Sequence, residues 1–170
     1  MRLFSGKIPL IAEEIVSSLS SDDDIEVESR AEVQSDLEAV LSEYLRLERE
    51  IVEEAKNRLE TRGLTYGQLS RVRQQVAKER GFPDTDEAIP YIIDQLLTML
   101  FHSANVVEVY ADDAVLRKKM MTSLRRHMDV ETDLDREVRS KIKNLTEGTS
   151  TFEIEYARVM EQIKRKKGLS

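Results

Sequence analysis

The sequence contains no cysteine and no tryptophan, and only three prolines and six glycines among its 170 residues. The absence of cysteine excludes disulfide bonds, thiolate catalysis and cysteine-based zinc sites. So few prolines, glycines and aromatic residues favour helices over sheets. No apolar run approaches the roughly 18 residues of a membrane-spanning helix, and Glu13 and Glu14 interrupt the N-terminal apolar stretch. We therefore expect a cytoplasmic protein with no secretory signal and no membrane contact.

Charged side chains make up 35% of the sequence and hydrophobic side chains 40%. A typical domain has about 25% charged residues. High charge with regular apolar spacing is typical of amphipathic helices that have wide solvated faces. The net charge is −7, divided into −5 for residues 1–81 (12 bases, 17 acids) and −2 for the rest (14 bases, 16 acids). Because neither half is basic, composition argues against a general nucleic-acid-binding protein.

The two halves of the chain share a pattern of residues. Residues 8–11 match residues 89–92 at a displacement of 81, and residues 54–56 match residues 137–139 at a displacement of 83. Near the end of each half, Val72, Val76 and Gly81 match Val159, Ile163 and Gly168 at a displacement of 87. A slowly growing displacement indicates a duplicated unit with insertions in its connections. We therefore predict two repeats, over residues 1–82 and 83–170.

Each half is predicted to open with a helix placed by its proline. Proline is tolerated in the first helical turn, where its missing N–H costs little. Ser5 and Asp86 lie four residues before Pro9 and Pro90, and both residue types cap helices well. The spacing therefore predicts helices that begin at Ser5 and Asp86. The short apolar segments that follow, 25–27 and 106–109, are interpreted as connectors, with paired strands as the alternative.

The rest of each half also has helical spacing. Residues 29–62 contain no proline or glycine, so they form either one continuous helix or two that bend near Leu45 and Arg46. Further helices are predicted over 65–80, 112–128 and 151–167, with another that holds Leu134 and Leu145. The predicted fold is all-α, with two tandem pseudo-repeated helical lobes of about four helical segments each and a long spine helix as one alternative for the first half.

No pattern of residues indicates catalysis or a bound metal. The two histidines, His102 and His127, are 25 residues apart and show no metal-binding spacing. The acidic run Asp22–Asp24 lacks the alternating ligands and central glycine of a calcium loop, so a solvated turn explains it better. Phosphate-binding glycine loops and serine nucleophile motifs are also absent from the sequence. We expect no cofactor, no metal and no enzymatic activity.

Basic residues gather near the ends of two predicted helices. The first cluster precedes Gly81 and the second precedes Gly168, and together they contain Arg71, Arg73, Lys78, Arg80, Lys164, Arg165, Lys166 and Lys167. Cations at helix C-termini complement the helix dipole, which is a sufficient structural reason for them. They are also the candidate contacts for an anionic partner. Because no aromatic residues alternate with them, any nucleic-acid contact would be to the phosphate backbone.

The two ends of the chain and one internal stretch carry a family resemblance. These are residues 1–19, the stretch Leu134–Ile142, the turn Glu147–Ser150 and the tail Lys164–Leu169. Over essentially its whole length the chain resembles a bacterial family known only as domain of unknown function 507. The resemblance implies a helical protein with no assigned activity, cofactor or catalytic residue. Residues 51–56 depart from the family's more regular alternation of acids and bases.

The sequence thus specifies an architecture more clearly than an activity. We expect a protein–protein interaction or scaffold module without catalytic activity, whose protein partner is unknown. A homodimer is a further expectation, because a long apolar stripe can exceed what one lobe covers. The alternative is a nucleic-acid-associated protein that uses the basic helix ends.

Overall fold

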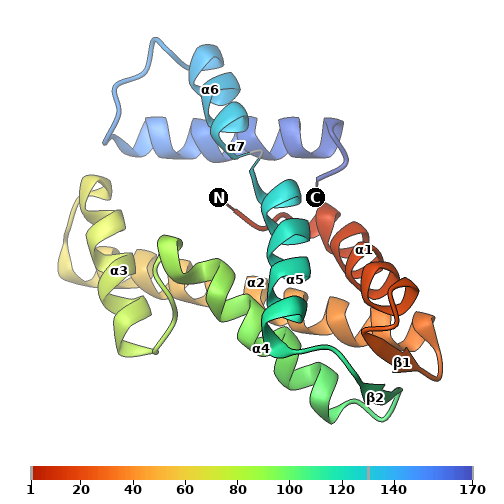
Figure 1. Ribbon diagram of the computed structural model, residues 1–170. Helices are drawn as coiled ribbons and strands as arrows, with labels where there is room; N and C mark the ends of the chain where they lie inside the picture. Colours follow the sequence, from red (N-terminus) through yellow and green to blue (C-terminus); the bar gives the residue numbers. More distant parts are fainter. Residues whose placement is uncertain (1, 130, 170) are drawn as a thin grey trace.

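The computed structural model describes residues 2–129 and 131–169, and its fold is mainly helical, as predicted (Figure 1). The elements in chain order are α1 (Ile8–Ser21), β1 (Ile25–Val27), α2 (Arg30–Arg62), α3 (Leu69–Glu79), α4 (Ala88–His102), β2 (Val106–Val109), α5 (Asp113–Met128), α6 (Glu131–Lys141) and α7 (Ser150–Lys166). Short 3-10 turns, Ser5–Lys7, Tyr66–Gln68 and Thr85–Glu87, precede α1, α3 and α4.

The opening helices start later than predicted. Pro9 does lie in the first turn of α1 and Pro90 in the first turn of α4, as the missing N–H of proline requires. The predicted caps Ser5 and Asp86 are wrong, because both lie within 3-10 turns. The Ser5 hydroxyl instead donates a hydrogen bond of 3.5 Å to the carbonyl oxygen of Leu169.

Helix α2 is one continuous helix of 33 residues, and therefore about 50 Å long. It begins after Ser29, whose hydroxyl accepts a hydrogen bond from the Glu32 N–H, and ends at Gly63 in the left-handed region (φ 62°). Both halves of the helix bury apolar residues within the chain, namely Val33, Leu37, Leu41, Tyr44, Ile51, Ala55 and Leu59. The stripe on which a homodimer was expected is thus already covered.

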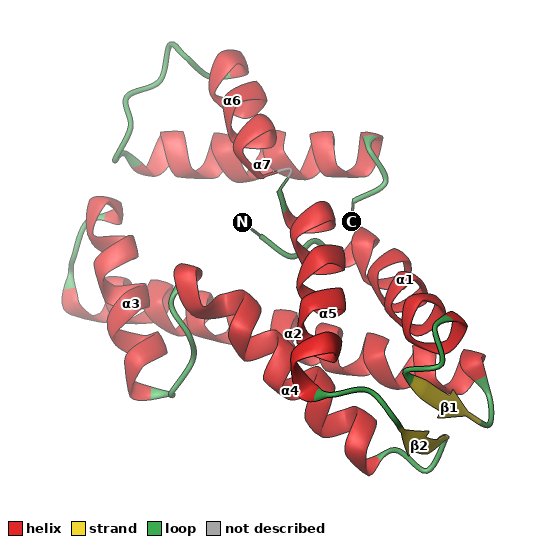
Figure 2. Ribbon diagram, in the orientation of Figure 1, coloured by secondary structure: helices red, strands yellow, loops and turns green. Residues whose placement is uncertain are grey.

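The two short apolar segments pair as strands, so their interpretation as connectors is wrong. β1 and β2 are antiparallel, with Ile25 opposite Val109 and Glu26 opposite Glu108, and the register is irregular between Glu26 and Val27 (Figure 2). Strands this short gain their stability from what they pack against. Here the buried Ile25 belongs to the largest apolar core, against which Val109 also packs.

The largest core is shared by the two halves of the chain. It joins α1, the first part of α2, α4 and α5, with the β1–β2 pair at one end. The first helix of each half packs against a helix of the other half, α1 against α5 and α4 against α2. Met120 and Met128 of α5 are fully buried in this core, where their unbranched side chains can fill irregular gaps.

Two helical hairpins extend from this core, each with a small core of its own. The second part of α2 packs against α3 around Ile51, Ala55 and Val76. Helix α6 packs against α7 around Val138, Phe152 and Ile163, and this α6–α7 hairpin lies above α3 in the view of Figure 1. Phe4 and Leu169, one near each end of the chain, complete the second of these cores.

Helix α4 contributes the most uniformly apolar surface to the shared core. Its buried residues are Ala88, Ile89, Ile92, Ile93, Leu96, Leu97 and Leu100. With 15 residues it is shorter than the roughly 20 that cross a bilayer. Over the described part of the chain, no helix is both long enough and apolar enough for a membrane span.

Candidate functional site

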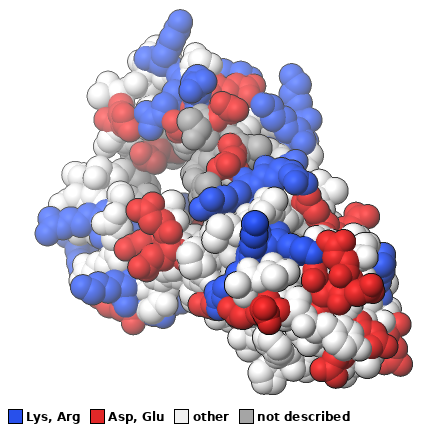
Figure 3. All heavy atoms as spheres, viewed as in Figure 1, with Lys and Arg blue, Asp and Glu red and all other residues white. Residues whose placement is uncertain are grey.

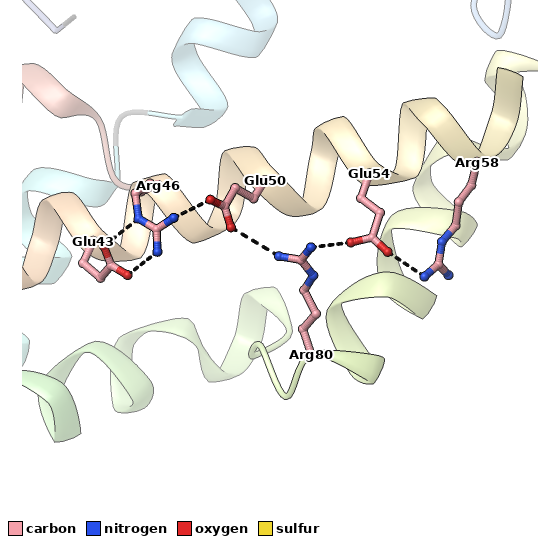
Figure 4. A network of polar contacts seen from close by, with 6 residues as sticks. All are labelled: Glu43, Arg46, Glu50, Glu54, Arg58 and Arg80. Atoms are coloured by element: carbon pink, nitrogen blue, oxygen red, sulfur yellow. Dashed lines mark hydrogen bonds and ion pairs between the residues drawn. The ribbon is translucent and has the colours of Figure 1, made fainter. Parts of the chain in front are cut away.

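Several of the predicted anion contacts form ion pairs inside the protein. Arg80 contacts two carboxylates of α2, Glu50 at 3.3 Å and Glu54 at 2.6 Å. Figure 4 shows Arg80 between these two carboxylates, in a row of contacts that runs from Glu43 to Arg58. Lys167 likewise contacts Glu137 of α6 at 2.9 Å. These cations hold the ends of α3 and α7 against the helices beside them.

The same ion pairs shift the titration of the carboxylates. The pKa of Glu54 is lowered chiefly by its hydrogen bond from Arg58 and then by Arg80. The pKa of Glu137 is lowered chiefly by its hydrogen bond from Lys167. Opposite charge stabilises the ionised carboxylate in both cases. Both groups therefore favour the folded hairpins when they are ionised.

Other predicted contacts meet at a cleft although they are far apart in sequence. Arg73 and Lys78 of α3 line one side of the cleft, and Lys164 of α7 lines the other. Arg165 pairs with Glu161 at 3.4 Å on the surface of α7. Arg71 and Lys166 are exposed, do not line the cleft and form no ion pair with another described residue.

The cleft has a volume of about 1710 Å³ and lies between α3, α4 and α7, with the middle of α2 behind it. Its floor contains three aromatic rings from separate parts of the chain: Tyr44 of α2, Phe82 after α3 and Tyr91 of α4. The ring centroid of Phe82 is 5.0 Å from that of Tyr44 and 5.9 Å from that of Tyr91. Such spacing is typical of aromatic pairs that stabilise each other. The rings thus form an apolar surface inside a polar cleft.

A carboxylate flanked by two arginines lies beside these rings. Glu48 Oε1 is 4.0 Å from Arg2 Nε, and Glu48 Oε2 is 3.9 Å from Arg73 Nη2. Only 15% of the Glu48 side chain is exposed, whereas the arginines are 41% and 45% exposed. Burial, followed by the charge of Glu48, raises the pKa of the Tyr44 hydroxyl, which therefore stays protonated.

Phe4 links this group to α7. Lys164 Nζ is 5.0 Å from the centroid of the Phe4 ring, and Arg2 Cζ is 5.7 Å from the same centroid. Both distances are within the range of a cation–π interaction. Arg2 and Arg73 therefore concentrate positive charge around one carboxylate, Glu48, on the cleft floor.

Two members of this group, Arg2 and Glu48, were not among the predicted site residues. Arg2 lies in an irregular N-terminal segment, where no periodic pattern can place a side chain. Glu48 did carry a signal, because it lies four residues after Tyr44 and three before Ile51, on the face of α2 that is otherwise buried. A lone acid on an apolar helix face is therefore the sequence feature that could have located the cleft.

The rest of the cleft is acidic. Seven acids line it, Glu48, Asp84, Asp86, Glu87, Asp94, Glu153 and Glu161, against four bases, Arg2, Arg73, Lys78 and Lys164, which gives a net charge of −3. The outer surface is similarly mixed, since Figure 3 shows basic and acidic side chains interspersed over the viewed face. Among the described residues no group of three or more His, Asp or Glu side chains is placed to hold a metal ion.

Within the described part of the chain, the two histidines contact a carboxylate and a backbone carbonyl. The Ser123 hydroxyl donates a hydrogen bond to Glu14 at 2.7 Å, and His127 Nε2 contacts the same carboxylate at 2.8 Å. Burial, followed by the charges of Lys7 and Arg126, lowers the pKa of His127. His102 Nδ1 contacts the carbonyl of Thr98 at 2.7 Å. Since Ser123 and His127 both bond to the acid and not to each other, neither activates the other.

The acidic run after α1 has a structural partner. Lys119 of α5 contacts Asp22 at 2.6 Å and also contacts Asp24. Asp23 between them has a left-handed backbone (φ 57°), as in a tight turn. The interpretation of Asp22–Asp24 as a turn is therefore confirmed.

Comparison with known proteins gives a family but no activity. No curated protein matches the sequence. The family resemblance inferred from the two ends and the Leu134–Ile142 stretch is confirmed over nearly the whole chain. With its match to the family model over residues 1–169, the chain belongs to the family described as Protein of unknown function (DUF507).

Proposed function

We propose that this protein is a cytoplasmic interaction or scaffold module without catalytic activity, and that it binds a segment of a partner protein in the cleft between α3, α4 and α7. The observation that carries this proposal is the cleft itself, whose aromatic floor lies beside Arg2 and Arg73. Aromatic residues and arginine are the side chains that contribute most at protein interfaces. Here both are held by the fold at one concave surface.

The size of the cleft supports a protein segment as the ligand. Sites for small molecules usually have volumes of about 300–1,000 Å³. At about 1710 Å³, this cleft exceeds that range. Its walls also carry charges of both signs, such as Lys78 on α3 and Asp94 on α4. A peptide can present apolar, acidic and basic groups together, as such walls require.

Nucleic acid is the alternative partner, and the charges of the cleft argue against it. A strand of phosphates would meet seven acids and four bases. The cations at the helix ends are also engaged, Arg80 with Glu54 and Lys167 with Glu137. Retention on heparin at low ionic strength that is abolished by replacing Lys164, Arg165, Lys166 and Lys167 with glutamine would favour the alternative.

Photo-crosslinking in the native cell tests the proposed function. Gln74 and Gln75 are exposed neighbours on α3, but only Gln74 lines the cleft. The photoreactive residue p-benzoylphenylalanine in place of Gln74 should yield a covalent adduct with a specific protein, and in place of Gln75 it should not. Absence of an adduct at Gln74, or the same adducts from both positions, would contradict the proposal.

A homodimer stays a prediction of its own. Helix α2 gives it no support, because α1, α4 and α3 cover its apolar stripe. Light scattering at micromolar concentration tests it, and a monomer of 19.6 kDa would remove it.

We also propose that residues 1–82 and 83–170 are two copies of one helical unit. In support, the contact between Glu54 and Arg80 has a counterpart in Glu137 and Lys167, displaced by 83 and 87 residues. Gly81 and Gly168 follow α3 and α7 with left-handed backbones, φ 66° and 68°. Superposition of the two halves in an experimental structure tests this, since these pairs should coincide and unrelated positions would contradict it.

A further inference from the structure

We infer that Arg2 and Arg73 form a carboxylate-binding site, and that the cleft recognises a partner segment in which an acidic residue adjoins an aromatic or large aliphatic one. This inference rests on the proposed function, which it makes chemically specific. It assigns a task to two arginines that have no hydrogen-bond acceptor among the described residues.

The first observation is that the donors of these two arginines are unused. The distances from Arg2 and Arg73 to Glu48, 4.0 and 3.9 Å, are too long for hydrogen bonds. No described residue accepts a hydrogen bond from either guanidinium group. Other arginines are engaged, as Arg58 is with Glu54 at 2.7 Å and Arg139 with Asp135 at 3.1 Å. Arg71 also has no hydrogen-bond acceptor among the described residues, but it lies outside the cleft, whereas Arg2 and Arg73 line it.

The second observation is the charge balance on the cleft floor. Two cations, Arg2 and Arg73, flank the single carboxylate of Glu48. A guanidinium group presents parallel N–H donors that match the two oxygens of a carboxylate. One added carboxylate would therefore accept the unused donors and reduce the excess positive charge.

The third observation is that aromatic rings and acidic side chains surround these cations. The half-buried rings of Phe82 and Tyr91 offer an apolar surface on the same floor, packed against the buried ring of Tyr44. The rim carries Asp84, Asp86, Glu87 and Asp94, which favour basic residues in the flanks of the partner segment and repel a chain of phosphates. The best-fitting occupant is thus a peptide with one acid beside an apolar anchor and with basic flanks.

Peptide selection tests the inference with the full-length protein. A phage library of random dodecapeptides is selected on the wild type, on Arg73→Gln and on Arg71→Gln, the matched control on the same helix but outside the cleft. We expect wild type and Arg71→Gln to enrich peptides with Asp or Glu beside an aromatic residue or leucine. The best peptide should bind about tenfold or more weakly to Arg73→Gln, because a charge-assisted hydrogen bond is lost.

Two further variants protect this result from a folding artefact. Arg2→Gln removes the second guanidinium from a different segment, so it should reproduce the loss. Arg73→Lys keeps the positive charge but lacks the paired N–H donors of the guanidinium group, so it should lose less affinity for the peptide than Arg73→Gln. Circular dichroism spectra and melting temperatures of the variants should match those of the wild type.

Other outcomes would overturn the inference in distinguishable ways. Enriched peptides without an acid, or with affinities indifferent to Arg73→Gln and Arg2→Gln, would remove the carboxylate site but leave the proposed function. No enrichment at all would remove both. Binding of a single-stranded oligonucleotide that Arg73→Gln abolishes would replace the peptide carboxylate with phosphate as the ligand.

Discussion

At the scale of single residues, Gly6 shows how a position without a side chain can determine a contact between the two ends of the chain. Its N–H donates a hydrogen bond of 2.6 Å to the carbonyl of Leu169. A Cβ atom at Gly6 would lie 2.4 Å from both Gly168 O and Leu169 C, well inside van der Waals contact. Because these are backbone atoms, no rotamer change relieves the clash. Only glycine allows the N-terminal segment to approach the tail this closely.

We therefore predict that Gly6→Ala displaces the C-terminal tail and lowers the free energy of unfolding by about 1–3 kcal/mol, the usual cost of overpacking. Urea denaturation followed by circular dichroism measures the change. Gly67→Ala is the matched control, because the nearest atom to its Cβ is 3.8 Å away. That control should stay within about 0.5 kcal/mol of the wild type. Equal free energies of unfolding for Gly6→Ala and Gly67→Ala would contradict the prediction, because the C-terminal tail would then move aside without loss of stability.

At the scale of elements, each hairpin is closed by an ion pair and an apolar residue after its last helix. After α3, the Phe82 N–H donates to the carbonyl of Ala77 at 2.9 Å, and Arg80 contacts Glu54. After α7, the Leu169 N–H donates to the carbonyl of Lys164 at 2.8 Å, and Lys167 contacts Glu137. The carboxylates in both pairs have lowered pKa values, so acid should loosen both hairpins.

The pH dependence follows from the sign of these shifts. Because the folded-state pKa of Glu54 lies below its ordinary value of 4.5, its contribution is complete above pH 4.5 and is lost as the pH falls through the folded-state pKa. We predict that Glu54→Gln melts at a lower temperature than the wild type at neutral pH. The difference between the two should narrow in acid, where the wild type also loses the charge.

Thermal melts from neutral pH into the acid range measure this difference. The control is Glu53→Gln, the adjacent residue on α2, whose one ion pair is a looser contact with Lys56 at 3.6 Å. Its melting temperature should parallel that of the wild type across the series. If the difference in melting temperature between Glu54→Gln and the wild type stayed constant with pH, the wild type would not lose the stabilisation by Glu54 in acid.

Sequence periodicity predicts the helices well because a helix repeats its buried face along its own length. The stripe from Val33 to Leu59 gave α2 with nearly its observed ends. The strands were missed because three or four residues carry no decisive period, and their pairing across about 80 residues comes from tertiary contacts. The predicted caps failed for a similar reason, since Ser5 finds its acceptor at Leu169. The local sequence pattern therefore predicts where the helices lie, but it does not predict which distant residues they contact.

At the scale of the whole molecule, the two walls of the cleft are attached in different ways. The α3 wall rests on α2, which runs without interruption from the shared core into the hairpin. The α7 wall belongs to a hairpin whose helices begin after α5 has ended at Met128. The N-terminal segment joins this hairpin to the core, because Leu3 is buried in the shared core and Phe4 in the core of α6 and α7. Adjacent residues thus serve two different cores.

This arrangement predicts opposite outcomes for two neighbouring substitutions. Phe4→Ala removes a ring that is 2% exposed from the α6–α7 core, at a cost of about 3–5 kcal/mol to that hairpin. Hydrogen exchange followed by mass spectrometry should then show lost protection in α6 and α7, with α1, α2 and α4 unchanged. Leu3→Ala, at an equally buried position, should instead lower protection in the shared core. If both variants exposed the same helices, the N-terminal segment would not be the connection between the hairpin and the core, and the α7 wall of the cleft would depend on some other contact.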